Sequence, residues 1–375
     1  MELHRILFIA EGQLGDLLLL TPALRAVKSR FPSSSVSVLV VERHKEVEIP
    51  SGQFADLNAT PGERESSVLG TNKNVDELLI VNRLALRSFH GLKRIKAELA
   101  IGRSLRRRKF DAAICTFPED RFALWAFASG ARVRVGQNKQ SLHRLLTHKA
   151  DIEKASKGVL EYYCALAMAV GAEIVSHTTE YEIPESSKRW ADEFLRANAL
   201  EDKRRIVAIH PGATGNYKIW PPERYAALIG YLDDRQDTRI VLCRGDQDES
   251  IIEAIKQIIR CPVVEVETGG DVGRFAAVLQ RCALCISNDS GPRHLAVAVG
   301  TPTLAFFRQH HDREWGIYPG TETCVTLKGA QQCPVCPTGR CLDKVPEGEK
   351  FGSACMRMID LNLARAAVNN ILSVK

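Results

Sequence analysis

The chain has 375 residues, with 51 Lys and Arg against 45 Asp and Glu, and 45% of its residues are hydrophobic. This length fits two domains, and the apolar fraction is enough for packed cores, which excludes a disordered, collagen-like or short disulfide-stabilised chain. The sequence holds no run of about 18 uncharged apolar residues and does not begin like a cleaved signal peptide, so we expect a cytoplasmic protein.

The first half alternates strand-like and helix-like segments. Arg5–Ala10 predicts a strand, Asp16–Arg30 a helix and Val36–Val41 a β-branched strand, which together open a parallel α/β sheet. Residues 51–74 are rich in Gly, Ser, Thr and Asn and predict a long loop. Further along the chain, the pattern predicts two strands and a helix: Glu77–Val81, Ala112–Cys115 and Lys157–Val170.

A second α/β series follows a predicted crossover. Ser176–Pro184 is expected to form a strand and connection, and Ser186–Ala199 a helix. The strands then expected are Arg205–His210, Arg239–Cys243, Val263–Val266, Ala283–Ser287 and Thr303–Phe307. Two similar halves of this kind predict two Rossmann-like domains that face each other across a cleft.

Residues 83–109 form a strongly basic segment that holds one acid, Glu98. Such a cluster is typical of either a solvated helix face or a site for an anionic partner. Because no nucleic-acid-binding motif accompanies it, an anionic membrane surface or lipid head group is the partner we favour.

Three strand-to-helix turns carry residues suited to a phosphorylated ligand. The turn at residues 11–16 combines glycines with Asp16, which is either a helix cap or a base that accepts a proton from a substrate hydroxyl. The loop at 210–221 brings glycines, Thr214 and Lys218 together, a combination that suits a diphosphate. At 286–294, a strand runs into Ser290 and Gly291 at the start of a helix, where phosphate would bind.

These motifs, in this order along the chain, resemble those of the bacterial ADP-heptose:lipopolysaccharide heptosyltransferase family. The members of that family are inverting glycosyltransferases of GT-B architecture. The resemblance rests on residues 5–24, on 209–221 and on 287–302, and so spans most of the chain. It implies an N-terminal acceptor-binding domain over 1–180 and a C-terminal nucleotide-sugar-binding domain over 181–355. A last helix, within 356–375, is expected to pack back on the first domain.

The resemblance also implies roles for single residues. Asp16 would activate the acceptor hydroxyl, and Lys218 would neutralise the leaving diphosphate. The donor residues implied are Ala213, Thr214, Lys218, Glu249, Asp289, Ser290, Gly291 and His294, with Asp246 or Asp248 as alternatives to Glu249 at the ribose. For the acceptor, an anionic glycolipid at the cytoplasmic face of the inner membrane, we expect Gly15, Arg106, Arg107 and Arg132 to contribute.

No DxD pair is placed to clamp a nucleotide through a metal, so we expect catalysis without a cofactor. Separately, Cys333, Cys336, Cys341 and Cys355 could form a structural zinc site, or remain thiols or local disulfides. The other functions open to this sequence are transfer from another nucleotide sugar to a cell-surface glycan, a GT-B-like sugar-nucleotide epimerase, and a non-catalytic binder.

Overall fold

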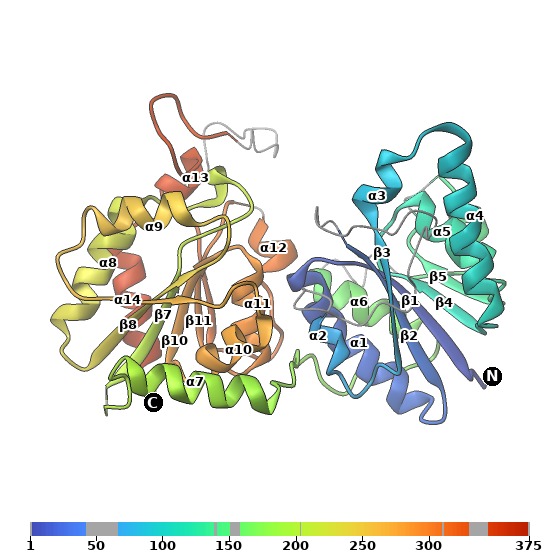
Figure 1. The fold of residues 1–375 in the computed structure, drawn as a ribbon, viewed down its shortest axis with the longest axis horizontal. Helices are drawn as coiled ribbons and strands as arrows, with labels where there is room; N and C mark the ends of the chain where they lie inside the picture. The colour runs from blue at the N-terminus through green and yellow to red at the C-terminus, as the bar shows by residue number, and fades with distance from the viewer. Residues whose placement is uncertain are drawn as a thin grey trace. The chain divides into compact units, whose positions relative to one another are not determined.

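The computed structural model describes residues 2–42, 67–138, 141–150, 158–202, 204–309, 311–329 and 344–373. The chain divides into two compact units, Met1–Tyr181 and Glu182–Lys375 (Figure 1). Each unit is built on a six-stranded parallel sheet, which is the α/β architecture that the sequence predicts. Within the described part of the chain, no helix is long and apolar enough to cross a bilayer.

The first unit has the strand order β3-β2-β1-β4-β5-β6. Its strands are β1 (Arg5–Glu11), β2 (Ser35–Glu42), β3 (Glu77–Asn82), β4 (Ala112–Cys115), β5 (Val133–Gly136) and β6 (His148–Lys149). Its helices are α1 (Leu14–Arg30), α2 (Ser67–Gly70), α3 (Arg83–Ser88), α4 (Gly91–Arg107), α5 (Asp120–Ala128), the 3-10 turn η1 (His143–Leu145) and α6 (Val159–Met168). The helix α2 lies inside the predicted 51–74 loop, most of which is outside the described residues.

The second unit has the order β12-β11-β10-β7-β8-β9. Its strands are β7 (Arg205–His210), β8 (Thr238–Arg244), β9 (Val264–Glu267), β10 (Leu284–Asn288), β11 (Thr303–Phe306) and β12 (Cys324–Leu327). Its helices are α7 (Glu185–Ala197), the 3-10 turn η2 (Asn216–Lys218), α8 (Pro222–Asp234), α9 (Glu249–Lys256), α10 (Val272–Gln280), α11 (Gly291–Ala298), α12 (His311–Trp315), α13 (Ala354–Arg357) and α14 (Leu361–Ser373).

The chain order reverses at the middle of each sheet. In the first unit the reversal lies between β1 and β4, and in the second between β7 and β10. Ligands of open parallel sheets bind outside the carboxyl ends of the strands at such a reversal. The turns after β1, β4, β7 and β10 are therefore where each unit is expected to carry its functional residues.

The prediction for the last helix is wrong. Helix α14 was expected to pack back on the first domain, but Ala364, Val368 and Leu372 are buried in the hydrophobic core of the second unit. Its polar contacts also lie within the second unit, because Asn369 accepts hydrogen bonds from Tyr231 of α8 and from Arg235, which directly follows that helix. The apolar stripe of α14 is thus used within the second unit.

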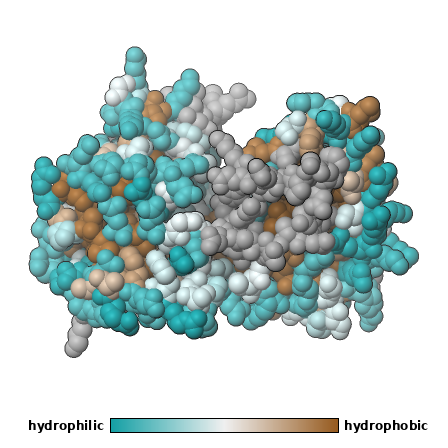
Figure 2. All heavy atoms as spheres, viewed as in Figure 1, coloured by the Kyte–Doolittle hydropathy of each residue, from teal (hydrophilic) through white to brown (hydrophobic). Residues whose placement is uncertain are grey.

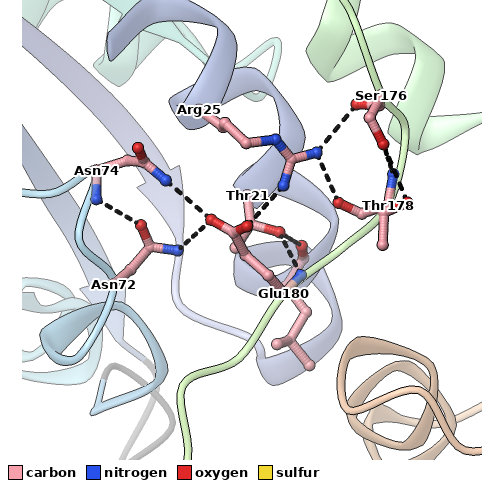
Figure 3. A network of polar contacts seen from close by, with 8 residues as sticks. Thr21, Arg25, Asn72, Asn74, Ser176, Thr178 and Glu180 are labelled. Atoms are coloured by element: carbon pink, nitrogen blue, oxygen red, sulfur yellow. Dashed lines mark hydrogen bonds and ion pairs between the residues drawn. The ribbon is translucent and has the colours of Figure 1, made fainter. Parts of the chain in front are cut away.

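The prediction of a strand within Ser176–Pro184 is also wrong, because this segment joins neither sheet. It is held instead by a polar network on α1 (Figure 3). Arg25 binds the Glu180 carboxylate at 2.6 Å and the carbonyl oxygens of Ser176 and Thr178. Side chains satisfy the backbone of this segment, so it needs no neighbouring strand.

A proline inside α1 accounts for a further hydrogen bond of this network. Pro22 has no N–H, so the carbonyl of Leu18 loses its helical partner. The Thr21 hydroxyl donates to that carbonyl at 2.7 Å and accepts a hydrogen bond from the Glu180 backbone N–H at 3.1 Å (Figure 3). The helix defect thereby becomes an attachment point for the end of the first unit.

Candidate functional site

Asp16 lies in the first turn of α1, just beyond the carboxyl end of β1. Its side chain is buried, at 9% exposure, and accepts a hydrogen bond of 2.8 Å from the hydroxyl of Tyr163 on α6. Burial and the neighbouring Asp16 charge raise the pKa of Tyr163 well above its ordinary value, so the phenol remains a donor at neutral pH. Gln13, not Asp16, is the cap residue of α1, so the alternative of a cap-only role does not apply.

Gly12 shapes the turn that leads to Asp16. A Cβ atom at Gly12 would lie 2.9 Å from a methyl of Val40 and 3.0 Å from the backbone of Glu42, so only glycine fits this close approach to β2. The adjoining Glu11 binds Arg83 at 2.6 Å, and Arg83 also reaches Glu119 after β4 at 3.3 Å. This buried ion-pair cluster fixes the turns on both sides of the β1–β4 reversal. The pairing could have been anticipated only from the position of each residue at the end of a strand or after it.

The three arginines expected at the acceptor do not share this edge. Arg106 and Arg107 lie in the last turn of α4, which leads into β4, and Arg132 directly precedes β5. All three are therefore near the amino ends of the strands, whereas Gly15 and Asp16 follow the carboxyl end of β1. The structure thus places the three arginines at the opposite edge of the sheet from Gly15, which charge along the sequence does not reveal, and their role at the acceptor stays a prediction.

In the second unit, the predicted phosphate-binding turns lie side by side. Lys218 of η2 donates to Asp289, after β10, with a separation of 3.4 Å. Ser290 is the cap residue of α11, yet its hydroxyl makes no capping bond and contacts the carbonyl of Asn288 at 3.3 Å. Gly291 begins the helix, while Ala213 is half-buried and Thr214 exposed in the loop after β7. A cation and a helix N-terminus thus meet at the β7–β10 reversal.

Asn288 holds these two turns together. Its amide nitrogen donates to the carbonyl of Pro211 at 2.6 Å, and its amide oxygen accepts from the Trp220 backbone and from the Tyr225 hydroxyl, each at 3.0 Å. The side chain is fully buried. A single asparagine at the end of β10 therefore sets the path of the whole 211–220 loop.

The acidic turn after β8 places Asp248 and Glu249 differently. Asp248 is buried and binds His210 at 3.1 Å and the Gly245 N–H at 2.9 Å. Burial alone would raise the pKa of Asp248, but the bond and charge of His210 outweigh it and lower that pKa. Glu249 is 59% exposed and pairs with Arg244. Of the acids considered for the ribose, Asp248 is the one joined to the strand ends.

His294 lies inside the helix–sheet packing rather than at the surface. It is 3% exposed and shares a hydrogen bond with the hydroxyl of Tyr318. Burial, aided by the charges of Arg293 and Lys218, lowers the pKa of His294 to about 3, so the ring is neutral. The resemblance placed this residue at the donor, but its contacts are those of a structural residue.

Sequence reasoning missed two residues after β11. Arg308 is 3% exposed, stacks over the Tyr217 ring at 4.8 Å and approaches His311 at 2.8 Å. His311 in turn lies 3.9 Å from Asp289, and burial and Arg308 lower the pKa of His311. Their position directly after an apolar strand was the signal available, since β11 neighbours β10 in the sheet.

The cysteines divide into two groups. Cys115, Cys164, Cys243, Cys282 and Cys285 are free and buried, and Cys261 is free and half-buried. Of the expected zinc ligands, Cys355 is buried on α13, whereas Cys333, Cys336 and Cys341 lie outside the described residues. Among the described residues, no cluster of three or more His, Cys, Asp or Glu could hold a metal.

Comparison with known proteins agrees with this arrangement. A family model described as glycosyltransferase family 9 (heptosyltransferase) matches residues 98–342. Lipopolysaccharide heptosyltransferase 3 of Escherichia coli is 25% identical over 78% of this chain and 80% of its own length. Lipopolysaccharide heptosyltransferase 2 of Escherichia coli K12 is 23% identical over 81% of this chain and 82% of its own.

Solved structures show the same fold. A family 9 glycosyl transferase from Veillonella parvula superposes with a TM-score of 0.77 at 22% identity, covering 100% of this chain and 99% of that one. The heptosyltransferase WaaC of E. coli, solved with ADP, gives 0.68 at 17% identity, covering 98% and 99%. The fold is thus that of the GT-B heptosyltransferases, and with the family model covering most of its length, the chain belongs to glycosyltransferase family 9.

Proposed function

We propose that this enzyme transfers a heptose from ADP-heptose to a lipopolysaccharide inner-core acceptor, with inversion and without a metal ion. The curated relatives are named for heptosyl transfer to lipopolysaccharide, and the related WaaC has been solved with ADP. The proposal assigns donor binding to the C-terminal domain, over 181–355, and acceptor binding to the N-terminal domain, over 1–180.

The contact between Lys218 and Asp289 carries the donor half of the proposal. A lysine held by one carboxylate at 3.4 Å is a cation that a diphosphate can take over. Ser290 and Gly291 begin a helix whose cap hydroxyl is not engaged in capping, and such a start favours phosphate oxygens. Ala213 and Thr214 would add contacts from the facing loop, and Asp248 or Glu249 would bind the ribose.

Asp16 is proposed as the base. Inverting transfer needs one carboxylate to take the proton of the attacking hydroxyl while the leaving diphosphate is stabilised elsewhere. The Tyr163 hydroxyl donates to one oxygen of Asp16 and so orients the carboxylate just beyond the end of β1. Gly15, next to it in the turn, gives the acceptor room to approach the backbone.

Product analysis tests the proposal directly. The protein is incubated with a panel of nucleotide sugars and truncated core acceptors, with and without EDTA, and products are identified by mass spectrometry. We expect heptosylated acceptor from ADP-heptose in both conditions. Release of free or epimerised sugar would indicate an epimerase, and loss of activity in EDTA that Mg²⁺ or Mn²⁺ restores would refute metal independence.

Two variants separate catalysis from binding. Asp16→Asn should reduce transfer by about 100-fold or more and leave ADP affinity within about twofold, because a base acts on the acceptor and not on the nucleotide. Lys218→Ala should instead weaken ADP affinity by about tenfold or more. If both variants bind ADP as well as the wild type does, and the wild type yields no product, the protein is a non-catalytic binder and not a transferase.

The acceptor of this reaction is an anionic glycolipid, so the proposal includes peripheral contact with the cytoplasmic face of the inner membrane. A structural zinc at Cys333, Cys336, Cys341 and Cys355 stays a prediction beside it. Metal analysis of the purified protein tests the zinc site, and less than about a tenth of an equivalent would exclude it.

A further inference from the structure

Helix α4 carries two apolar stripes, and the core uses one of them. Ala97, Ile101 and Leu105 are fully buried against the first sheet. A second stripe, Leu92, Ile95 and Leu99, repeats at intervals of three and four residues and is 75%, 55% and 51% exposed. Apolar side chains this exposed, in a row on one helix, mark a surface that meets a partner.

The second stripe borders a hollow between α4 and α5. This cavity has a volume of about 450 Å³, and Leu124 and Trp125 of α5 line its far side. Its size falls in the range of roughly 300–1,000 Å³ typical of sites for small apolar ligands. A Cβ atom at Gly102 would lie 2.9 Å from the Cβ of Ala128, so the helices nearly touch beneath it.

The acidic group in the hollow is already paired. Glu98 is the one carboxylate among its lining residues, and it accepts a hydrogen bond of 2.7 Å from the Trp125 indole and an ion pair of 3.1 Å from Arg121. The acid is thereby neutralised without an outside cation. Apart from three arginines, the remaining lining consists of apolar residues and glycine. Figure 2 shows exposed brown atoms at its upper right, over the region of α4.

Cations surround this apolar surface. Within the described residues, no ion pair joins a carboxylate to any of the six basic side chains of α4, which are Lys93, Arg94, Lys96, Arg103, Arg106 and Arg107. Arg94, Arg103 and Arg106 line the hollow itself. Protein–protein interfaces are depleted in lysine, whereas helices that lie in a membrane interface combine a Lys- and Arg-rich face with Leu and Phe.

We propose that the α4–α5 face docks on an anionic phospholipid bilayer. The exposed stripe and Leu124 enter the boundary between head groups and acyl chains, and the hollow accommodates acyl-chain carbon. The cations of α4 contact the lipid phosphates. Charge complementarity favours this occupant over a second copy of the chain, because two faces with the same unpaired cations would repel each other.

The position of this face also bears on how the acceptor would reach Asp16, an argument that rests on the proposed function. A second hollow of about 330 Å³ shares Arg94, Glu98 and Leu124 with the first and extends to Glu119. Glu119 is bound to Arg83, which binds Glu11 at the carboxyl edge where the turn to Asp16 begins. A bilayer on the α4–α5 face would thus place a lipid-anchored acceptor beside that edge.

Vesicle co-sedimentation tests the surface without any enzymatic reaction. The full chain is mixed with phosphatidylcholine vesicles that contain about one third phosphatidylglycerol, or none. We expect binding to the anionic vesicles, a reduction of about tenfold or more for Leu99→Glu, and about fivefold for each of Arg94→Glu and Arg103→Glu. Leu363→Glu and Arg260→Glu, exposed positions of the second unit, should bind as the wild type does.

Two further measurements keep this inference separate from the proposed function. Transfer to a water-soluble core acceptor without acyl chains should be unchanged in Leu99→Glu, whereas transfer to the lipid-linked acceptor in vesicles should fall. If Leu99→Glu and the two arginine variants bind anionic vesicles as well as the wild type does, the proposal that this face docks on the membrane is refuted. A dimer in light scattering that Leu99→Glu converts to a monomer, without vesicle binding by the wild type, would assign the face to a second copy instead.

Discussion

Gly212 is the position where the structure makes its sharpest prediction for the second unit. A Cβ atom added there would lie 1.8 Å from Oδ1 and 2.2 Å from Cγ of Asp248, far inside van der Waals contact. The backbone of Gly212 is not in the left-handed region, so Gly212→Ala tests space alone. An ordinary contact between a carbon and an oxygen atom is more than about 1 Å longer than the 1.8 Å distance to Oδ1. The Asp248 carboxylate must therefore move by more than about 1 Å to accommodate the methyl group.

That movement separates Asp248 from both of its partners, the His210 ring at 3.1 Å and the Gly245 N–H at 2.9 Å. A hydrogen bond to a charged, largely buried group is worth about 1.5–3 kcal/mol. Losing both predicts that Gly212→Ala lowers the free energy of unfolding of the second unit by about 3–5 kcal/mol. Since both partners lie at the carboxyl edge of the sheet, we expect weaker ADP binding as well.

Urea unfolding followed by tryptophan fluorescence measures this, because Trp190, Trp220 and Trp315 of the four tryptophans belong to the second unit. Gly230→Ala is the matched control. Nothing lies within 4 Å of a Cβ there, and the position is inside α8, so this variant should be as stable as the wild type or about 0.5–1 kcal/mol more stable.

A double-mutant cycle identifies the cause. In an Asp248→Ala background the carboxylate is gone, so adding Gly212→Ala should cost less than about 1 kcal/mol. If Gly212→Ala costs the same in both backgrounds, or leaves the wild type within about 0.5 kcal/mol, the steric reasoning fails.

Three further predictions concern other parts of the molecule. Tyr163→Phe should lower kcat/KM by about 10- to 100-fold, through loss of the hydrogen bond to Asp16, while Tyr162→Phe should not, which steady-state kinetics would show. The pKa of His294 is 6.5 in the unfolded chain and about 3 in the native protein. The stabilisation that the neutral ring contributes is therefore fully present above pH 6.5, and the free energy of unfolding decreases as the pH falls below that value. Urea unfolding at pH 7 and pH 5 should show the wild type losing about 2 kcal/mol more than His294→Gln, and an equal loss would contradict the burial of a neutral ring. Glu180→Gln should destabilise the first unit by about 1–2 kcal/mol in thermal unfolding, because the Arg25 ion pair is lost, whereas the exposed Glu185→Gln should have no effect.

The order of elements and the candidate turns could be predicted from the sequence. Buried parallel strands are continuous apolar runs, as in Arg205–His210, which the structure has at the same bounds. Residues after such runs lie at the carboxyl edge of a parallel sheet, so Asp16, Lys218 and Ser290 could be proposed from local patterns, whereas Asp289 was implied only by the family resemblance. Local signals of this kind depend on residues a few positions apart.

Contacts between distant segments were decided only by the tertiary structure. The carboxylate that His210 binds, the tyrosine that holds Asp16, and the sheet edge at which Arg106 lies all depend on how the strands are ordered. The apolar stripe of α14 illustrates the same point, since its sequence predicts a buried face but not the surface that buries it. A hydrophobic pattern specifies that side chains leave water, which is non-directional, whereas the partner is set by topology and by the pairing of buried charges.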